Sequence, residues 1–486
     1  MTSSDALPTG AFSMRSPFGR RAVGLSIAAA VGGFLFGFDS SVINGAVDSI
    51  STDFSLNTFI TGFVVAIALL GCAVGAIIAG NLSDRWGRLR VMFLGAIMFF
   101  VSSIGSALAF AAWDLAIWRV IGGLGIGIAS VVAPAYISEI APRQIRGSLA
   151  SLQQLAITLG IFAALLSNAV LATVAGGAND VLWWGLEAWR WMFLVGVVPS
   201  AVYGILSFTV PESPRFLLTK GRTQEARAIF AQLVPSVDLD KTVKDLQTTI
   251  DTDKKNAGVS LRGPVLGFQG IVWVGIILSV FQQFVGINVI FYYSTSLWAS
   301  VGFGQTNSFA ISVFTSVLNV LVTLIAIWLV DRVGRKPILL TGSIIMAVSL
   351  ATMAIAFSFA TGSGQDVHLS GAWGPIALVA ANLFVVGFGA SWGPLVWVLL
   401  GEIFPSRIRG KALGVAAGAQ WIANFLITVS FPTMSSWSLP LTYAMYAAFA
   451  VLSFIYVLLR VPETKGMELE QTETLFIQKP KAPVAS

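Results

Sequence analysis

Charged residues, histidine and cysteine are scarce in this sequence. Only 11% of its 486 residues are charged, whereas 56% are hydrophobic, and the mean hydropathy is +0.82. Soluble domains carry about twice that share of charge, so the composition excludes a soluble enzyme. One histidine, His368, and one cysteine, Cys72, are too few for a metal site or an intramolecular disulfide. We expect Cys72 to pack among apolar neighbours.

Long apolar runs make up most of the chain. A membrane helix needs about 20 predominantly apolar residues. This criterion predicts twelve spans, at 22–47, 57–80, 91–112, 115–138, 149–174, 190–210, 268–298, 307–330, 337–360, 372–400, 412–433 and 440–460. The first run is much longer than the apolar part of a signal peptide, so we expect it to remain as a span. The predicted fold class is an all-α membrane protein.

Basic residues are sorted between the loops. The loops from even to odd spans contain Arg85, Arg88, Arg90, Arg143, Arg146, Arg332, Arg335, Lys336, Arg407, Arg409 and Lys411. The opposite loops contain acidic residues but no Lys or Arg, except Arg190 at the edge of a span. The positive-inside rule then predicts that the basic loops and both termini are cytoplasmic. This sorting explains the net charge of +6 better than a nucleic acid partner does.

The spans and the polar segments divide the chain into five parts. They are a cytoplasmic tail at 1–21, a six-helix bundle at 22–210, a cytoplasmic helical linker at 211–266, a second six-helix bundle at 267–460 and a cytoplasmic tail at 461–486. A solvated linker is favoured over a separate ligand-binding module, for which some fifty residues leave little room. We expect Thr223 to cap one linker helix and 238–251 to form a second, amphipathic helix.

Three motifs occur twice in the same order, roughly 250 residues apart. DRWGR at 84–88 returns as DRVGR at 331–335, EIAPRQIRG at 139–147 as EIFPSRIRG at 402–410, and PESP at 211–214 as PETK at 462–465. The chain is therefore predicted to contain two parallel six-helix repeats. In secondary transporters, such repeats surround a substrate site near the middle of the membrane.

These motifs resemble those of a known family over almost the whole chain. Together with PESPRFLL at 211–218, QQFVGIN at 282–288, GEIFP at 401–405 and PETKG at 462–466, they are similar to the sugar porters of the major facilitator superfamily. GFLFGFDSSVINGA at 33–46 and AQWIAN at 419–424 most resemble bacterial proton-coupled glucose permeases. The resemblance implies a cell-membrane transporter that works as a monomer by alternating access, with a hexose and a proton as cargo. It implies no enzymatic activity and no cofactor.

Uncharged amides inside the apolar spans are suited to sugar binding. A sugar hydroxyl donates and accepts hydrogen bonds, and an amide meets both roles without the desolvation cost of a charge. Aromatic rings can cover the apolar face of the sugar. By resemblance, the sugar-contacting positions are Gln154, Gln282, Gln283, Asn288, Asn319, Trp397, Gln420 and Trp421, with Phe36 and Tyr292 as further aromatic candidates. Hydrogen bonding between helices, without a ligand, is the alternative.

The seventh span cannot present its amides from a straight helix. Asn288 would point about 120° away from Gln282 and about 140° away from Gln283. All three can face one ligand only if the helix breaks, and Gly286 lies between them. Tyr292 follows Asn288 by one turn. The resemblance implies that its ring covers the sugar, and simple packing is the alternative.

Asp39 is the only carboxylate well inside the first span, and Arg119 in the fourth span is its expected partner. An acid inside the membrane marks an ion or proton path by default. Protonating Asp39 would release Arg119 and shift the conformational equilibrium. By resemblance, proton-coupled porters share this arrangement, whereas facilitators carry an uncharged residue at this position. Symport is therefore favoured over a static salt bridge.

Other functions remain open at this point. The amides could equally accept xylose, galactose or inositol, and passive facilitation would need no proton. A sugar sensor without transport is least favoured, since the residues after Arg460 contain no obvious signalling domain.

Charged residues of the repeated motifs lie at predicted span ends. They are Asp84, Arg88, Glu139 and Arg146 in the first half, and Asp331, Arg335, Glu402 and Arg409 in the second. Opposite charges at these ends can bridge neighbouring helices. The resemblance implies a network that locks the cytoplasmic gate and breaks when the protein opens inward. The alternative is that these residues fix only turns and topology.

Overall fold

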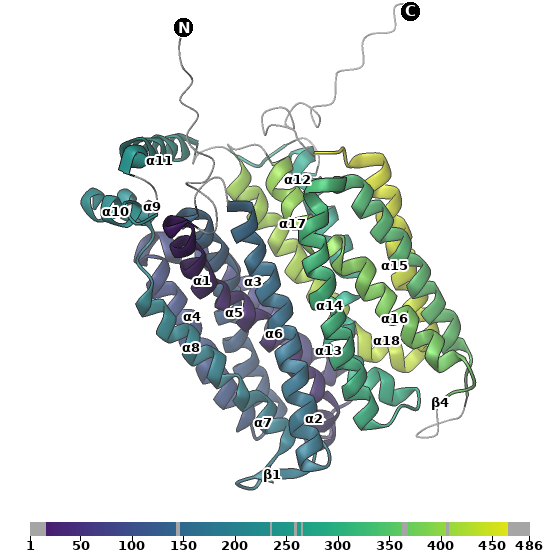
Figure 1. Ribbon diagram of the computed structural model, residues 1–486. Coiled ribbons are helices and arrows are strands. Elements are labelled where there is room, and N and C mark those ends of the chain that lie inside the picture. Colours follow the sequence, from purple (N-terminus) through teal and green to yellow (C-terminus); the bar gives the residue numbers. More distant parts are fainter. Residues whose placement is uncertain are drawn as a thin grey trace, which may run out of the picture.

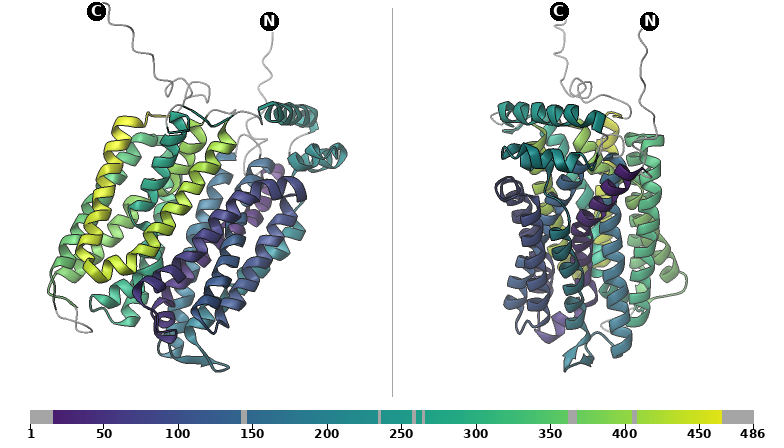
Figure 2. Two further views of the ribbon diagram at one scale, coloured as in Figure 1. Left: turned by 180° about the vertical axis from the view of Figure 1, so that it is seen from behind. Right: turned by 60° about the vertical axis from the view of Figure 1, so that its left-hand side comes forward.

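Two helical bundles lie side by side in the computed structural model (Figures 1 and 2). The structure describes residues 16–141, 146–233, 236–256, 260–263, 266–361, 368–404 and 408–464. The first bundle contains α1 (Pro17–Val42), the 3-10 turn η1 (Ile43–Gly45), α2 (Val47–Asp53), α3 (Thr58–Trp86), α4 (Arg88–Ala107), α5 (Ala112–Ile140), α6 (Arg146–Ala175), a hairpin of β1 (Val181–Trp183) and β2 (Leu186–Glu187), α7 (Ala188–Val195) and α8 (Val197–Thr209).

The second bundle repeats this plan. It contains α12 (Gly270–Phe284), α13 (Ile287–Ser300), α14 (Gln305–Val333), α15 (Arg335–Ser358), the short strands β3 (Ala360–Thr361) and β4 (His368–Leu369), α16 (Trp373–Gly389), α17 (Trp392–Ile403) and α18 (Arg409–Arg460). The two bundles contact each other through α3 with α18 and through α6 with α14.

Twelve spans can be followed along the described chain, as predicted. Within the described residues, eleven helical segments, some of them with internal breaks, are long and apolar enough to cross a membrane. The last of them consists of two helices, because Ser438 interrupts α18 with an extended backbone at φ −161° and ψ 102°. The repeated motif makes the tight turns from α3 to α4 and from α14 to α15. Gly87 and Gly334 occupy these turns at φ 96° and 109°, a conformation that disfavours residues with a side chain.

Three linker helices lie at one end of the bundles, beside the beginning of α1 (Figure 1). They are α9 (Pro214–Thr219), α10 (Thr223–Phe230) and α11 (Ser236–Asn256), and a small apolar core that includes Phe216, Leu217 and Ile250 joins them. The predicted cap at Thr223 is wrong. Helix α10 begins at Thr223 itself, and Arg222 occupies the cap position, where its side chain makes no hydrogen bond that caps the helix. We call the opposite end of the bundles, where β1 and β4 lie, the outer end.

Candidate functional site

The seventh span is broken at the predicted place. Helix α12 ends at Phe284 and α13 begins at Ile287, with Gly286 in the left-handed conformation between them at φ 84° and ψ 21°. The break brings the three amides together. Asn288 Nδ2 donates to Gln283 Oε1 at 2.5 Å, and Gln283 Nε2 donates to Gln282 Oε1 at 3.5 Å.

Gln282 also reaches a second break, which the sequence analysis missed. Its Nε2 donates to the carbonyls of Trp392 at 2.8 Å and Gly393 at 3.1 Å, at the start of α17. We expected one uninterrupted span at 372–400. Instead, α16 ends at Gly389, and Ser391 has a non-helical backbone at φ −133° and ψ −86°. The sequence GFGASWGP at 387–394 contains helix-breaking residues that could have indicated this break.

Aromatic side chains of the two halves also contact each other. The rings of Phe36 on α1 and Trp421 on α18 pack edge to face with centroids 5.4 Å apart. The neighbouring Gln420 Oε1 is buried and accepts no hydrogen bond from any described residue. A buried amide oxygen of this kind needs a donor, and a ligand hydroxyl can supply one.

The remaining predicted sugar contacts are spread over four helices. Asn319 is buried on α14, and its Oδ1 faces Gly389 at the end of α16. Gln154 is half-buried on α6, whereas Trp397 on α17 is 41% exposed. Tyr292 is buried on α13. No contact in the described structure tests whether these four residues bind a sugar.

Asp39 and Arg119 form the predicted ion pair. Arg119 Nη1 lies 2.6 Å from Asp39 Oδ1, and the two side chains are only 3% and 7% exposed. The guanidinium also lies 5.9 Å from the centre of the Phe193 ring. Its Nε atom is buried and has no partner among the described residues. Removing one partner of so buried a pair would leave an uncompensated charge.

A small cavity connects this ion pair to the aromatic residues. Its volume is about 10 Å³, close to the space that one water molecule requires. Asp39, Arg119 and Cys72 line it together with Phe36 and Tyr292. Cys72 is buried, as expected. The charged pair and two of the predicted sugar-covering rings therefore share one cavity.

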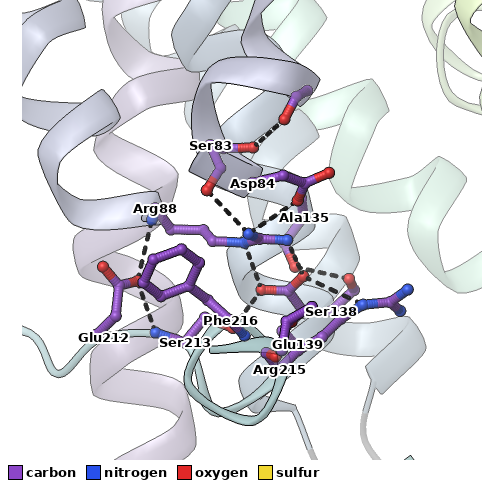
Figure 3. A network of polar contacts seen from close by, with 12 residues as sticks. Ser83, Asp84, Arg88, Ala135, Ser138, Glu139, Glu212, Ser213, Arg215 and Phe216 are labelled. Atoms are coloured by element: carbon purple, nitrogen blue, oxygen red, sulfur yellow. Dashed lines mark hydrogen bonds and ion pairs between the residues drawn. The ribbon is translucent and has the colours of Figure 1, made fainter. Parts of the chain in front are cut away.

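The charged residues of the first repeat form a network at the end of the bundle near the linker (Figure 3). Arg88 donates to both carboxylate oxygens of Glu139 at 3.0 and 2.8 Å, and its Nη1 lies 3.1 Å from Asp84 Oδ1. Ser213 also donates to Glu139, at 2.5 Å. Glu212 accepts the backbone N–H of Arg88 at 3.0 Å, where α4 begins.

The second repeat builds the same arrangement. Arg335 Nη2 lies 2.8 Å from Glu402 Oε1, and Thr464 donates to Glu402 at 2.6 Å. Glu463 accepts the backbone N–H groups of Arg335 at 2.9 Å and Lys336 at 3.0 Å.

Glu212 and Glu463 are functional candidates that the sequence analysis missed. A carboxylate at a helix N-terminus satisfies free N–H groups and interacts favourably with the helix dipole. Both glutamates occupy the same position in the repeated motifs PESP and PETK, and this repetition could have indicated that they are functional candidates. The side chains of Arg146, Asp331 and Arg409 lie outside the described residues.

Replacing Gly286 by alanine is expected to destabilise the protein by about 2–4 kcal/mol. A residue with a Cβ is strained at φ 84°, and the added Cβ would lie 2.7 Å from Cδ2 of the buried Tyr446 ring. Thermal unfolding of the detergent-solubilised protein measures the effect. Gly270→Ala is the matched control, since a Cβ there meets open space. Equal melting temperatures for both variants would contradict the prediction that a side chain at position 286 strains the structure.

Comparison with known proteins agrees with this architecture. The sequence model of the family "Sugar (and other) transporter" matches residues 25–476. A glucose transport protein of Synechocystis is 50% identical over 449 residues, which cover 92% of this chain and 96% of the relative. A D-xylose-proton symporter of Escherichia coli is 35% identical over 485 residues, which cover 93% and 95%.

The fold has a solved counterpart as well. The structure of a proton:xylose symporter of the major facilitator superfamily bound to 6-bromo-6-deoxy-D-glucose superposes with a TM-score of 0.78 at 35% identity. The superposition covers 94% of this chain and 99% of that one. The chain therefore belongs to the sugar transporter family of the major facilitator superfamily.

Proposed function

We propose that this protein imports a hexose together with a proton across the cell membrane by alternating access, with D-glucose as the first candidate. The buried ion pair of Asp39 and Arg119 carries the proposal. It lies on a cavity that Phe36 and Tyr292 also line, so a change in its charge acts directly beside the predicted sugar site.

The relatives support both parts of the proposal. The 50% identical protein is a glucose transport protein, and a 39% identical protein of Staphylococcus epidermidis is also a glucose transporter. The 35% identical relative is a proton symporter, although its sugar is D-xylose. We therefore place glucose first and keep xylose, galactose and inositol as competitors to be measured.

The proposed division of roles uses the residues that the resemblance to sugar porters indicates. The amides of α12 and α13, with Gln154, Asn319 and Gln420, hold the sugar hydroxyls, while Phe36, Tyr292, Trp397 and Trp421 cover its apolar face. The networks around Arg88 and Arg335 close the cytoplasmic side, which contains both termini and the linker. We place one monomer in the cell membrane as the functional unit.

One proton is sufficient to drive useful accumulation. Each elementary charge that crosses 100 mV supplies about 2.3 kcal/mol, which corresponds to roughly fifty-fold accumulation at one proton per sugar. Uptake of radiolabelled glucose into proteoliposomes, with and without a protonophore, tests this directly. We expect the accumulation to collapse with the protonophore and the external medium to become alkaline when sugar is added. Intact uptake without proton movement would identify a passive facilitator instead.

A further inference from the structure

The break before α17 is held from two sides. On one side, Gln282 Nε2 donates to the carbonyls of Trp392 at 2.8 Å and Gly393 at 3.1 Å. On the other side, the indole Nε1 of Trp392 donates to Ser343 Oγ at 2.9 Å and to the carbonyl of Leu339 at 3.2 Å, both on α15. Trp392 is fully buried. We call the two bonds from its indole to α15 the indole tether.

The indole tether ends on a tightly packed part of α15. Ser343 Oγ lies 3.0 Å from Ser453 Oγ on α18, and both hydroxyls are buried. Ser391 Oγ donates to the carbonyl of Gly387 at 2.5 Å. It also lies against Gly342 on α15, where a Cβ would overlap it. Close packing and hydrogen bonds therefore both fix the break against α15.

This arrangement orients the amide of Gln282. An amide nitrogen has two N–H groups, and the carbonyls of Trp392 and Gly393 provide an acceptor for each. Gln282 therefore presents its Oε1 oxygen to a ligand, so that a sugar hydroxyl placed there must donate. If α17 moved away, Nε2 would lose its acceptors. The amide would then be free to turn over and to present a donor in place of the acceptor.

We propose that Trp392 is a positioning residue for sugar binding: its indole tether fixes the start of α17, and through two backbone carbonyls it fixes the orientation of the Gln282 amide. This inference rests on the proposed function, because it deepens the sugar site to which Gln282 belongs. Trp392 acts through Gln282 and does not touch the sugar. It differs in this from the predicted covering ring of Trp397, which is 41% exposed, whereas the Trp392 indole is buried against α15.

A double-mutant cycle tests whether Trp392 acts through Gln282. Trp392→Phe keeps an aromatic ring but lacks the indole N–H, and Ser343 keeps Ser453 as a partner. Binding of D-glucose and of D-xylose to the purified, detergent-solubilised protein is measured by titration calorimetry. We expect Trp392→Phe to raise the dissociation constant about fivefold, since one net hydrogen bond changes an equilibrium constant by a factor of about two to ten. In a Gln282→Ala background, the same substitution should change it by about twofold or less.

Trp189→Phe is the matched control. Trp189 is also fully buried, and its indole Nε1 donates to Asp53 Oδ2 at 2.9 Å, a bond within the first half that involves no amide of the predicted sugar site. This variant should lose stability without losing sugar affinity. Ser343→Ala is a second probe, and we expect it to weaken binding about twofold because the Leu339 carbonyl still accepts the indole N–H. It keeps the test decisive if Trp392→Phe does not fold.

Backbone hydrogen exchange at the start of α17 measures the indole tether without any sugar. The N–H of Leu395 donates to the carbonyl of Ser391 at 3.0 Å in the first turn. Trp392→Phe should speed its exchange about fivefold, whatever the protein transports.

The outcomes separate the positioning role from the proposed function. An equal loss of affinity from Trp392→Phe in both backgrounds, or an equal loss in Trp189→Phe, would overturn the positioning role. Sugar binding that Gln282→Ala leaves unchanged would overturn it as well, since Trp392 would have no sugar contact to act through. Faster exchange in a protein that binds neither sugar would support the indole tether and reject the proposed function.

Discussion

Asp39→Asn is expected to abolish proton-driven sugar accumulation, from roughly fifty-fold to no accumulation at 100 mV. Asparagine has nearly the same shape as aspartate but cannot carry a proton. Because Arg119 then loses its buried countercharge, we also expect lower stability. Exchange of sugar across the membrane without a proton gradient should persist in the variant, so the test compares accumulation and counterflow in the same proteoliposomes.

The control for Asp39→Asn is Asp114→Asn. Asp114 lies on the same helix as Arg119, but its hydrogen bonds to Trp118 and Phe110 stay within the outer part of the first half. The double variant Asp39→Asn with Arg119→Gln should recover stability without recovering accumulation. Accumulation that survives in Asp39→Asn would contradict the proposed role of the carboxylate.

Arg88→Met is expected to destabilise the protein more than the equivalent Arg335→Met. Arg88 and Glu139 are each only 9% exposed, whereas Arg335 and Glu402 are 12% and 26% exposed. Removing one partner of a buried pair costs about 3–5 kcal/mol. For the more solvated second pair we expect about half of that, because water screens the remaining charge.

In thermal unfolding of the detergent-solubilised protein, the melting temperature of Arg88→Met should therefore be lower than that of Arg335→Met. The control is Arg222→Met, since Arg222 and Glu225 are 52% and 56% exposed and exposed pairs contribute little. In membrane vesicles, both network variants should also shift an accessibility reporter toward the inward-open state. Equal melting temperatures for all three variants would contradict the claim that the ion pairs of Arg88 and Arg335 stabilise the closed gate.

The parts of this protein that could be predicted are those determined by local sequence or by a unique partner. Apolar runs of the length of a membrane helix predicted all twelve spans. The break at Gly286 could be predicted because Gln282 and Asn288 cannot face one ligand from a straight helix. Arg119 could be paired with Asp39 because few charges lie inside the spans.

The parts that could not be predicted depend on contacts between segments that are far apart in the sequence. Nothing local indicates that Glu212 reaches the N-terminus of α4 or that Asn44 bonds α13 of the other half. The break before α17 is stabilised partly by Gln282, which is more than a hundred residues away. The outer hairpin was missed as well, since its turn places Trp184 at φ 53°, a conformation that tryptophan rarely adopts.

The glutamates that cap α4 and α15 also bear on how the chain is made. Glu212 follows the last helix of the first bundle and Glu463 follows the last helix of the second, so each capped network is completed by the segment just after its own bundle. During translation, the first bundle can close its charged turn as soon as Glu212 has left the ribosome, before α12 is synthesised. The duplicated sequence thus provides each bundle with a carboxylate that caps a helix of that same bundle.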